Sequence, residues 1–235
     1  MLTARSVCAL GLLGALALAL SADDEAAQKE AAQKELGTAV ANLKALGLGV
    51  HNFCDANEGR LPDDIADKDG RYVLSWRVAL LPLIGEEKLF KQFKLDEPWD
   101  GPNNKKLIDQ MPKLYAPARG KAKAGETFYQ RFVGKGTLWP EKGAYTLAQI
   151  ADGTSNTALI VESGAPVTWT RPADLTFNAK APLPGLGGPF AGDFHTLMGD
   201  GSVLLFKKGC DQDTLKLVIT PDDGTAIDID KLLKK

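Results

Sequence analysis

Apolar residues recur every three or four positions between Leu36 and Phe53, which is the spacing of one face of an α-helix. The stripe consists of Leu36, Val40, Leu43, Leu46, Val50 and Phe53. The helix should run to about Ala56, because Gly59 and Pro62 follow and both end helices. Gly47 and Gly49 lie inside it, where each weakens a helix by about 1 kcal/mol relative to alanine or permits close packing against a sheet.

The segment from Ser75 to Asn104 holds the densest cluster of large apolar and aromatic residues outside the N-terminus. Ser75 is suited to cap a helix, which Pro82 should end or kink. A second short helix is predicted from Glu86, and Asn103 is expected to cap a third. The residues expected to point inward are Trp76, Leu80, Leu83, Leu89, Phe90, Phe93, Leu107, Ile108 and Met111. We expect this segment and the first helix to share one interior that leaves no room for a reactive pocket.

The C-terminal half has the shorter alternating or apolar runs that are typical of strands. Strands are predicted over residues 128–133 and 157–161, and a hairpin over residues 194–206 that turns at Asp200-Gly201. A short helix should follow at residues 213–219, and residues 168–188 form a long, proline-containing loop. The pattern therefore predicts an α+β fold, in which a long N-terminal helix packs on a small antiparallel β-sheet with short helices and long loops around it.

The N-terminal residues have the pattern of a secretory signal. Arg5 is followed by an uninterrupted apolar and small-residue run from Val7 to Leu20, and Ala19, Ser21 and Ala22 supply small residues for cleavage. This run is shorter than the ~20 residues of a membrane-spanning helix, so we expect cleavage rather than a membrane anchor. We divide the chain into a signal peptide at 1–22, a charged helical spacer at 23–35 and a single globular domain at 36–235. The protein should be exported to the periplasm, the cell surface or the medium, with membrane contact only through an uncleaved signal.

Charge and histidine content exclude several classes of function. The net charge of −2 argues against a nucleic-acid-binding protein, which would show a basic excess. Only two histidines are present, His51 and His195, and no Gly-x-Ser-x-Gly elbow of a serine hydrolase occurs. We therefore expect a protein that is not an enzyme. The weaker alternative is a hydrolase that uses His195 with Asp200 or Glu162.

Five short strings resemble the exported, prepilin-like bacterial proteins grouped as domain-of-unknown-function family 1559. They are Leu-Ser-Trp-Arg-Val-Ala-Leu-Leu-Pro at 74–82, Leu-Asp-Glu-Pro-Trp-Asp at 95–100, Ile-Ala-Asp-Gly-Thr-Ser-Asn-Thr at 150–157, Val-Thr-Trp-Thr-Arg-Pro-Ala-Asp-Leu at 167–175, and Phe-His with Gly-Asp-Gly-Ser-Val at 194–203. The resemblance implies a pilin-like domain and no established reaction. Many relatives begin with a prepilin processing site and a long apolar stalk. This chain has the repeat Ala-Ala-Gln-Lys-Glu instead, so assembly through a hydrophobic helix is not expected.

Two further sites are open at this point. Pseudopilins that this architecture resembles hold calcium in acidic C-terminal loops, and Asp193, Asp200, Asp222 and Asp223 could supply the oxygen ligands. Simple Asp-Gly turns explain the same residues, so we expect no cofactor and keep calcium as the alternative. The acidic residues 63–70 do not fit an EF-hand and predict a polar turn. Cys54 and Cys210 are either two buried thiols or a disulfide.

We therefore expect an exported, non-enzymatic protein of the cell envelope with a structural or interaction-mediating role. Its partners would be other envelope proteins or a second copy of the chain. The alternative is a binding module for an envelope glycan or a small solute, with Trp139, Trp169, His195 and the loop at 168–188 as the binding residues. Exposed tryptophans gathered in a cleft would favour binding, and buried ones would favour the structural role.

Overall fold

The computed structural model describes residues 22–234, so the predicted signal peptide lies outside the described residues except for its last position. The chain divides into two units, Met1–Lys34 and Glu35–Lys235. Helix α1 spans Ala22–Ala56, and its residues 23–35, the predicted spacer, are all exposed. Within the described residues, no helix combines the length and the apolar character that crossing a membrane requires.

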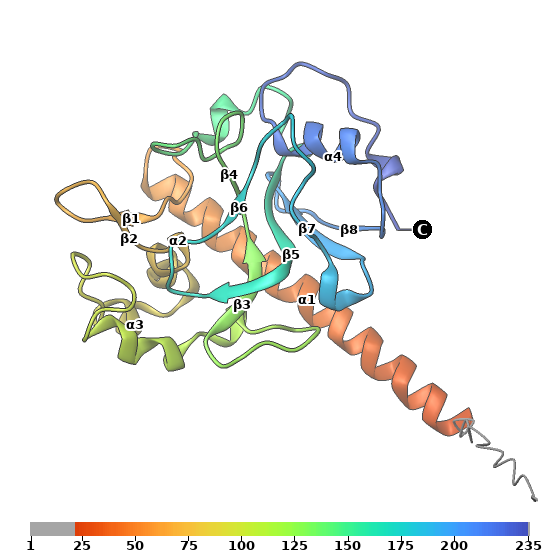
Figure 1. Ribbon diagram of the computed structural model, residues 1–235, viewed down its shortest axis with the longest axis horizontal. Coiled ribbons are helices and arrows are strands. Elements are labelled where there is room, and N and C mark those ends of the chain that lie inside the picture. The colour runs from red at the N-terminus through yellow and green to blue at the C-terminus, as the bar shows by residue number, and fades with distance from the viewer. Residues whose placement is uncertain (1–21, 235) are drawn as a thin grey trace, which may run out of the picture. The chain divides into compact units, whose positions relative to one another are not determined.

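The second unit is built on an antiparallel sheet of four strands in the order β3-β5-β7-β8 (Figure 1). Its strands are β3 (Glu126–Gln130), β5 (Ala158–Thr168), β7 (Phe194–Met198) and β8 (Val203–Phe206). The predicted hairpin is confirmed, because β7 and β8 pair in register and Asp200 accepts a hydrogen bond from the Ser202 N–H in the turn. The α+β class is confirmed.

Smaller elements surround this sheet (Figure 1). Two short pairs of strands are present, antiparallel β1 (Ile65–Ala66) with β2 (Tyr72–Leu74), and parallel β4 (Phe132–Val133) with β6 (Leu175–Thr176). The short helices are α2 (Trp76–Ala79), α3 (Glu87–Phe90) and α4 (Gln212–Ile219). Turns of 3₁₀ helix lie at Leu81–Ile84, Asn104–Gln110, Lys113–Tyr115, Leu147–Gln149, Gly188–Phe190 and Ile229–Lys231.

The two faces of the sheet carry two hydrophobic clusters. Neighbouring residues on β7 divide between them, with Leu197 in one cluster and Met198 in the other. The first cluster joins Leu43, Leu46, Val50 and Cys54 of α1 to Trp76, Val78, Leu80, Leu81, Leu89 and Phe93. This confirms the expected shared interior of the first helix and the tryptophan-containing segment. The second cluster joins Leu215, Val218 and Ile219 of α4 to Phe194, Met198 and Phe206 of the sheet.

The two glycines inside α1 mark close approaches. A Cβ atom at Gly47 would lie 2.9 Å from Leu197 Cδ1 of β7, and one at Gly49 would lie 2.7 Å from Ile84 Cγ2. Both distances are too short for a side chain, so glycine lets the helix backbone rest directly on its neighbours. The sequence expectation of close packing against a sheet is therefore confirmed for Gly47.

Three local expectations need correction. Asn103 makes no side-chain cap, and the segment after it is 3₁₀ helix. The single strand predicted over residues 128–133 is divided at Arg131, whose carbonyl accepts a hydrogen bond from the Leu175 N–H. The strand predicted over 157–161 continues to Thr168, because β3 and β7 pair along its two edges. Ser75 does cap α2, accepting a hydrogen bond from the Arg77 N–H at 3.3 Å.

Candidate functional site

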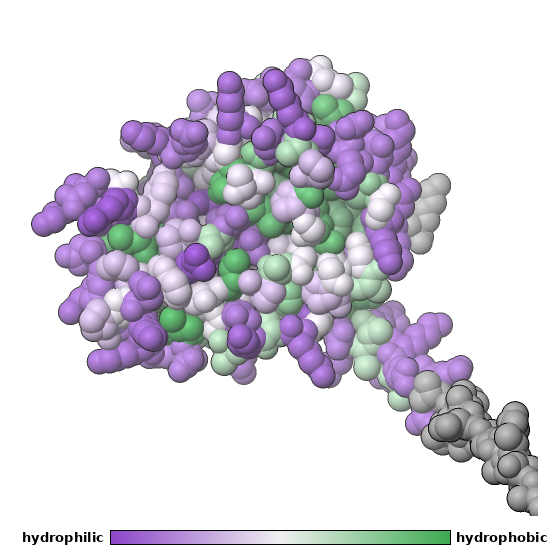
Figure 2. Space-filling model, in the orientation of Figure 1, coloured by the Kyte–Doolittle hydropathy of each residue, from purple (hydrophilic) through white to green (hydrophobic). Residues whose placement is uncertain are grey.

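The second unit contains a pocket of about 890 Å³, a volume typical of small-molecule sites. It is bordered by residues from three segments that are distant in sequence, at 63–72, 131–141 and 172–180, and by Thr220. The parallel pair β4 and β6 brings the second and third segments together. Figure 2 shows hydrophobic side chains among hydrophilic ones over the region where Figure 1 places β4, β6 and β7.

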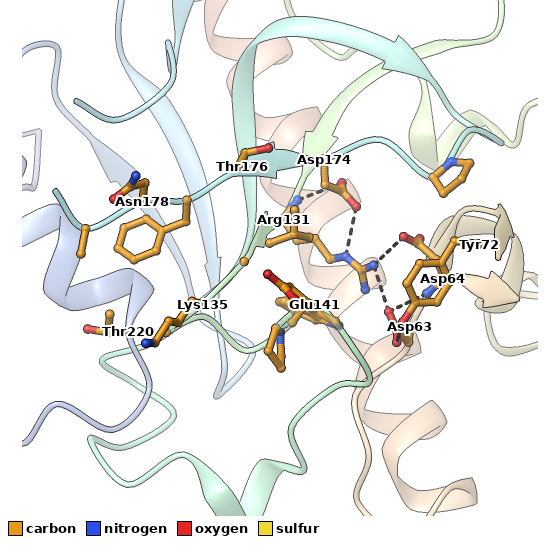
Figure 3. A pocket seen from close by; sticks show the side chains of 18 of the residues that line it. Asp63, Asp64, Tyr72, Arg131, Lys135, Glu141, Asp174, Thr176, Asn178 and Thr220 are labelled. Atoms are coloured by element: carbon orange, nitrogen blue, oxygen red, sulfur yellow. Dashed lines mark hydrogen bonds and ion pairs between the residues drawn. The ribbon is translucent and has the colours of Figure 1, made fainter. Parts of the chain in front are cut away.

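Arg131 lies at the centre of this pocket, and each of its three side-chain nitrogens contacts at least one acceptor (Figure 3). Its Nε donates to Asp174 Oδ2 at 3.0 Å and its Nη1 to the Pro62 carbonyl at 2.9 Å. Its Nη2 lies 3.2 Å from Asp63 Oδ1 and 2.9 Å from Asp64 Oδ2. The Arg131 side chain is only 2% exposed. A buried guanidinium held on every side in this way fixes the three carboxylates around it.

A second arginine supports the network from behind. Arg77 Nη2 donates to Asp174 Oδ1 at 2.8 Å, and its Nε donates to the Tyr129 carbonyl at 3.0 Å. Both side chains of the Arg77–Asp174 pair are at most 2% exposed. Arg77 also lies over the Trp76 ring, 4.6 Å from its centroid, in a cation–π contact. The network therefore holds two guanidiniums and three carboxylates, a formal charge of −1.

Burial opposes the ionisation of Asp64 in this network. Burial raises its pKa from 3.8 to about 6, and the charge of Asp174 adds to the rise. The opposing influences are the charge of Arg131 and the Trp76 N–H, which donates to Asp64 Oδ1 at 2.7 Å. Asp64 thus helps to cap helix α2 and would change its charge just below neutral pH.

The rim of the pocket carries charged groups that are not engaged. Lys135, Lys180 and Glu141 are exposed and border the pocket. Among the described residues, none of the three takes part in an ion pair. Apolar contact surface comes from Trp139, which is 4% exposed and lies under Arg131 at 4.8 Å, and from Phe177. The pocket thus combines a fixed ionic floor, free charges at the rim and aromatic walls.

A second buried ionic cluster lies in the main sheet. Glu162 of β5 pairs with Arg119, and its Oε2 lies 2.8 Å from both the backbone nitrogen and Nδ1 of His195 on β7. Burial alone would raise the pKa of Glu162, but the hydrogen bonds from His195 and Arg119 outweigh it and lower that pKa. Arg119 also lies over the Phe190 ring, 4.4 Å from its centroid. None of these residues borders the 890 Å³ pocket.

The binding residues predicted from the sequence do not all lie at the pocket. Residues of the long loop between 172 and 180 border the pocket, and so does Trp139. Trp139 is nevertheless only 4% exposed, so it is a buried tryptophan of the kind expected for the structural role and not the exposed one expected for binding. Trp169 does not border the pocket, because it is fully buried, stacked on Tyr115 and bonded through Nε1 to the Ile108 carbonyl at 2.9 Å. His195 is 3% exposed and bound to Glu162, so it lies in the sheet interior. Of the two acids considered as partners of His195, Glu162 contacts it, whereas Asp200 accepts the Ser202 N–H in the hairpin turn.

The four aspartates of the predicted calcium site are not gathered. Asp193 pairs with Lys234 and Asp222 accepts a hydrogen bond from the Tyr145 hydroxyl. Asp223 accepts hydrogen bonds from the Thr220 hydroxyl and from the Thr225 N–H. Over residues 22–234, no group of three or more His, Cys, Asp or Glu side chains is arranged to hold a metal ion. Their turn-forming and pairing roles account for these four residues.

The alternative of a disulfide between Cys54 and Cys210 is wrong for this structure. Both are free, buried thiols. Cys54 lies in the cluster under α1 and Cys210 in the cluster under α4, so the sheet separates them. Burial raises the pKa of Cys54 to about 11, which keeps this thiol protonated and unreactive near neutral pH.

Sequence reasoning missed the residues at the centre of the site. Arg131 was read as part of a half-buried strand, and Asp63 and Asp64 as a polar turn. Asp174 was quoted only inside the string at 167–175. One signal was available, since two adjacent acidic residues lie between Pro62 and Ile65. The polar turn itself is real, because Asp67 accepts hydrogen bonds from the Asp69 and Arg71 N–H groups.

Comparison with known proteins gives one match. A family model described as a protein of unknown function, DUF1559, matches residues 39–131, from helix α1 to Arg131. No curated protein and no solved structure matches the chain, so the pilin-like arrangement stays a prediction. The matched span contains the first two of the five strings that suggested this family, and it confirms the resemblance of this chain to the DUF1559 proteins.

Proposed function

We propose that this is an exported, non-enzymatic protein of the cell envelope that binds a small polar solute in the pocket around Arg131. The observation that carries the proposal is the pocket itself. Its volume of about 890 Å³ fits a small molecule, and its floor is fixed before any solute arrives. Preorganisation matters because a rigid site does not lose side-chain freedom when the solute binds.

The polar groups of the floor favour binding over catalysis. Asp63, Asp64 and Asp174 already accept hydrogen bonds from Arg131 or Arg77. A guanidinium lowers the proton affinity of the carboxylate it contacts, which makes that carboxylate a weaker general base. Asp64, whose pKa burial raises to about 6, is held in place by Arg131 and by the Trp76 N–H. The buried pair of Glu162 and His195 does not border the pocket, which removes the other acid–base candidate from its walls.

The binding test uses a substitution that fills the pocket. Thr176 of β6 is exposed and borders the pocket, and tryptophan is well tolerated in strands. Calorimetric titration of the mature protein with neutral sugars, amino sugars, amino acids and short peptides should identify at least one solute. Thr176→Trp should abolish its binding.

Thr225→Trp serves as the matched control, because Thr225 is equally exposed and does not border the pocket. It should bind the solute as the natural protein does. Binding that survives Thr176→Trp, or a panel in which no class of solute binds, would contradict the proposal.

Export is tested separately. Cell fractionation followed by N-terminal sequencing of the mature chain should find the protein outside the cytoplasm, beginning near Asp23. A chain that retains Met1 in the cytoplasm would remove the envelope from the proposal and leave the pocket to be explained in another compartment.

A further inference from the structure

The two sides of the pocket around Arg131 carry opposite charge. Figure 3 shows Asp63, Asp64 and Tyr72 on one side and Lys135 on the other, with Arg131 and Glu141 between them. The acidic side comes from the segment before β1, and Lys135 from the segment that follows β4. A solute that reaches across the pocket therefore meets different chemistry at its two ends.

The carboxylate oxygens on the acidic side can accept further hydrogen bonds, and almost no unused donors lie beside them. Asp63 Oδ2 accepts one hydrogen bond, from the Tyr72 hydroxyl at 2.8 Å, and Asp64 Oδ2 contacts Arg131 alone. Each carboxylate oxygen can accept two hydrogen bonds, so both retain capacity. The Arg131 nitrogens are already directed at Asp63, Asp64, Asp174 and the Pro62 carbonyl. With three carboxylates and two guanidiniums, this side favours a positively charged donor.

The opposite side supplies donors. Lys135 lies on that side, is exposed, and carries three N–H donors with no acceptor. Lys180 is also exposed and borders the pocket, and neither lysine is used in an ion pair within the part of the chain that the structure describes. This side therefore favours a negatively charged acceptor. Glu141 adds one acceptor between the two sides, where it can receive an amide N–H.

Apolar residues also line the pocket. Pro140 and Pro172, which are partly exposed, border it together with Trp139 and Phe177, each of which is 4% exposed. These groups offer contact area to hydrocarbon or peptide planes without asking for hydrogen bonds. A neutral sugar would leave the net charges of both sides without a partner.

Resting on the proposed binding function, we infer that the solute is a zwitterion of the amino-acid or short-peptide class. Its ammonium group lies at Asp63 and Asp64, and its carboxylate lies at Lys135. The apolar residues of the lining contact the chain that joins the two charged groups.

The test compares three forms of one tripeptide, Ala-Phe-Ala, by calorimetric titration of the mature protein at pH 7.5. The free zwitterion should bind, and both the N-acetylated and the C-amidated forms should bind about tenfold more weakly, because each loses one charged contact. A neutral disaccharide should bind more weakly still.

The variant Lys135→Gln identifies the end that holds the carboxylate. It should weaken binding of the free tripeptide by about three- to tenfold, as expected for an exposed ion pair, and should leave binding of the C-amidated form unchanged. Lys142→Gln is the matched control. Lys142 is an exposed lysine in the same loop that does not border this pocket, so it should change neither form.

The outcomes separate the inference from the function on which it rests. Equal binding of the free and blocked tripeptides, or no tripeptide binding at millimolar concentration, overturns the zwitterion. If a sugar then binds and Thr176→Trp abolishes that binding, the pocket is still a binding site for another class of solute. If Thr176→Trp leaves the tripeptide affinity unchanged, the site of binding is elsewhere and both proposals fail.

Discussion

This protein contains two buried ionic clusters that use the same kinds of side chain in different ways. In the sheet, Glu162 interacts with Arg119 and His195. These interactions outweigh the effect of burial and lower the pKa of Glu162. At the pocket, Asp64 shares Arg131 with two other carboxylates, and its pKa rises to about 6. Glu162 is contacted by Arg119 and by both the backbone nitrogen and Nδ1 of His195, whereas Asp64 has Arg131 and the Trp76 N–H.

The difference shows which cluster is stabilised by its own contacts and which one could gain from a bound cation. A carboxylate whose donors suffice is stabilised in its charged form and serves to tie strands together. A cluster with surplus carboxylate, open to a pocket, keeps an unfavourable charge that a bound cation can relieve. The same comparison separates the structural cluster from the candidate site without any reference to sequence motifs.

The largest expected effect follows removal of the shared arginine. Arg131→Met keeps an unbranched apolar stem, removes the guanidinium, and leaves Asp63, Asp64 and Asp174 without their common partner. Breaking a buried ionic network in this way should lower the free energy of unfolding by about 4 kcal/mol. Urea unfolding followed by circular dichroism measures it.

Arg171→Met provides the control for this variant. Arg171 is exposed and makes one cation–π contact with Trp99 at 5.5 Å. Its replacement should therefore lower the free energy of unfolding by less than about 1 kcal/mol. Comparable losses in the two variants would show that the pocket network contributes little to stability.

A smaller loss is expected in the sheet. Glu162→Gln retains one acceptor for the His195 N–H but leaves Arg119 without its charged partner, which should cost about 3 kcal/mol at pH 7. Because the pKa of Glu162 is lowered in the folded state, its stabilisation is present above pH 4.5 and is lost as the pH falls through the lowered pKa. The difference between the natural protein and this variant should therefore shrink in acid.

Urea unfolding at a series of pH values measures this difference, with Glu141→Gln as the control at an exposed glutamate. A gap between the natural protein and Glu162→Gln that stays constant down to pH 3 would contradict the assignment of the lowered pKa to Glu162.

The smallest effect is expected at Asp64, where stability should change with pH in the direction opposite to that at Glu162. The pKa of Asp64 is raised from 3.8 to about 6, so its contribution is fully present below pH 3.8 and is lost as the pH rises through 6. Asp64→Asn keeps an oxygen to accept the Trp76 N–H and does not titrate. Relative to this variant, the natural protein should lose on the order of 2 kcal/mol between pH 4 and pH 7. Parallel unfolding curves over that range would show that Asp64 ionises normally.

Elements defined by neighbours in sequence were predicted well. The apolar stripe of α1, the Ser75 cap and the hairpin at Asp200-Gly201 each depend on residues within a few positions of one another. Such local patterns specify helices and turns directly, because the interacting atoms are brought together by the backbone geometry alone. The α+β class followed from the order of those elements.

The site could not be predicted in this way. Arg131 meets Asp63 across 68 positions and Asp174 across 43, and only the pairing of β4 with β6 and the position of the segment before β1 bring them together. Local patterns also did not show that Trp139 and Trp169 are buried in the same hydrophobic cluster and that, of the two, Trp139 borders the pocket. The sequence by itself determined the helices, the turns and the class of fold. The tertiary structure decided which charges are buried together, because the energy of a buried charge depends on partners that the chain order does not place beside it.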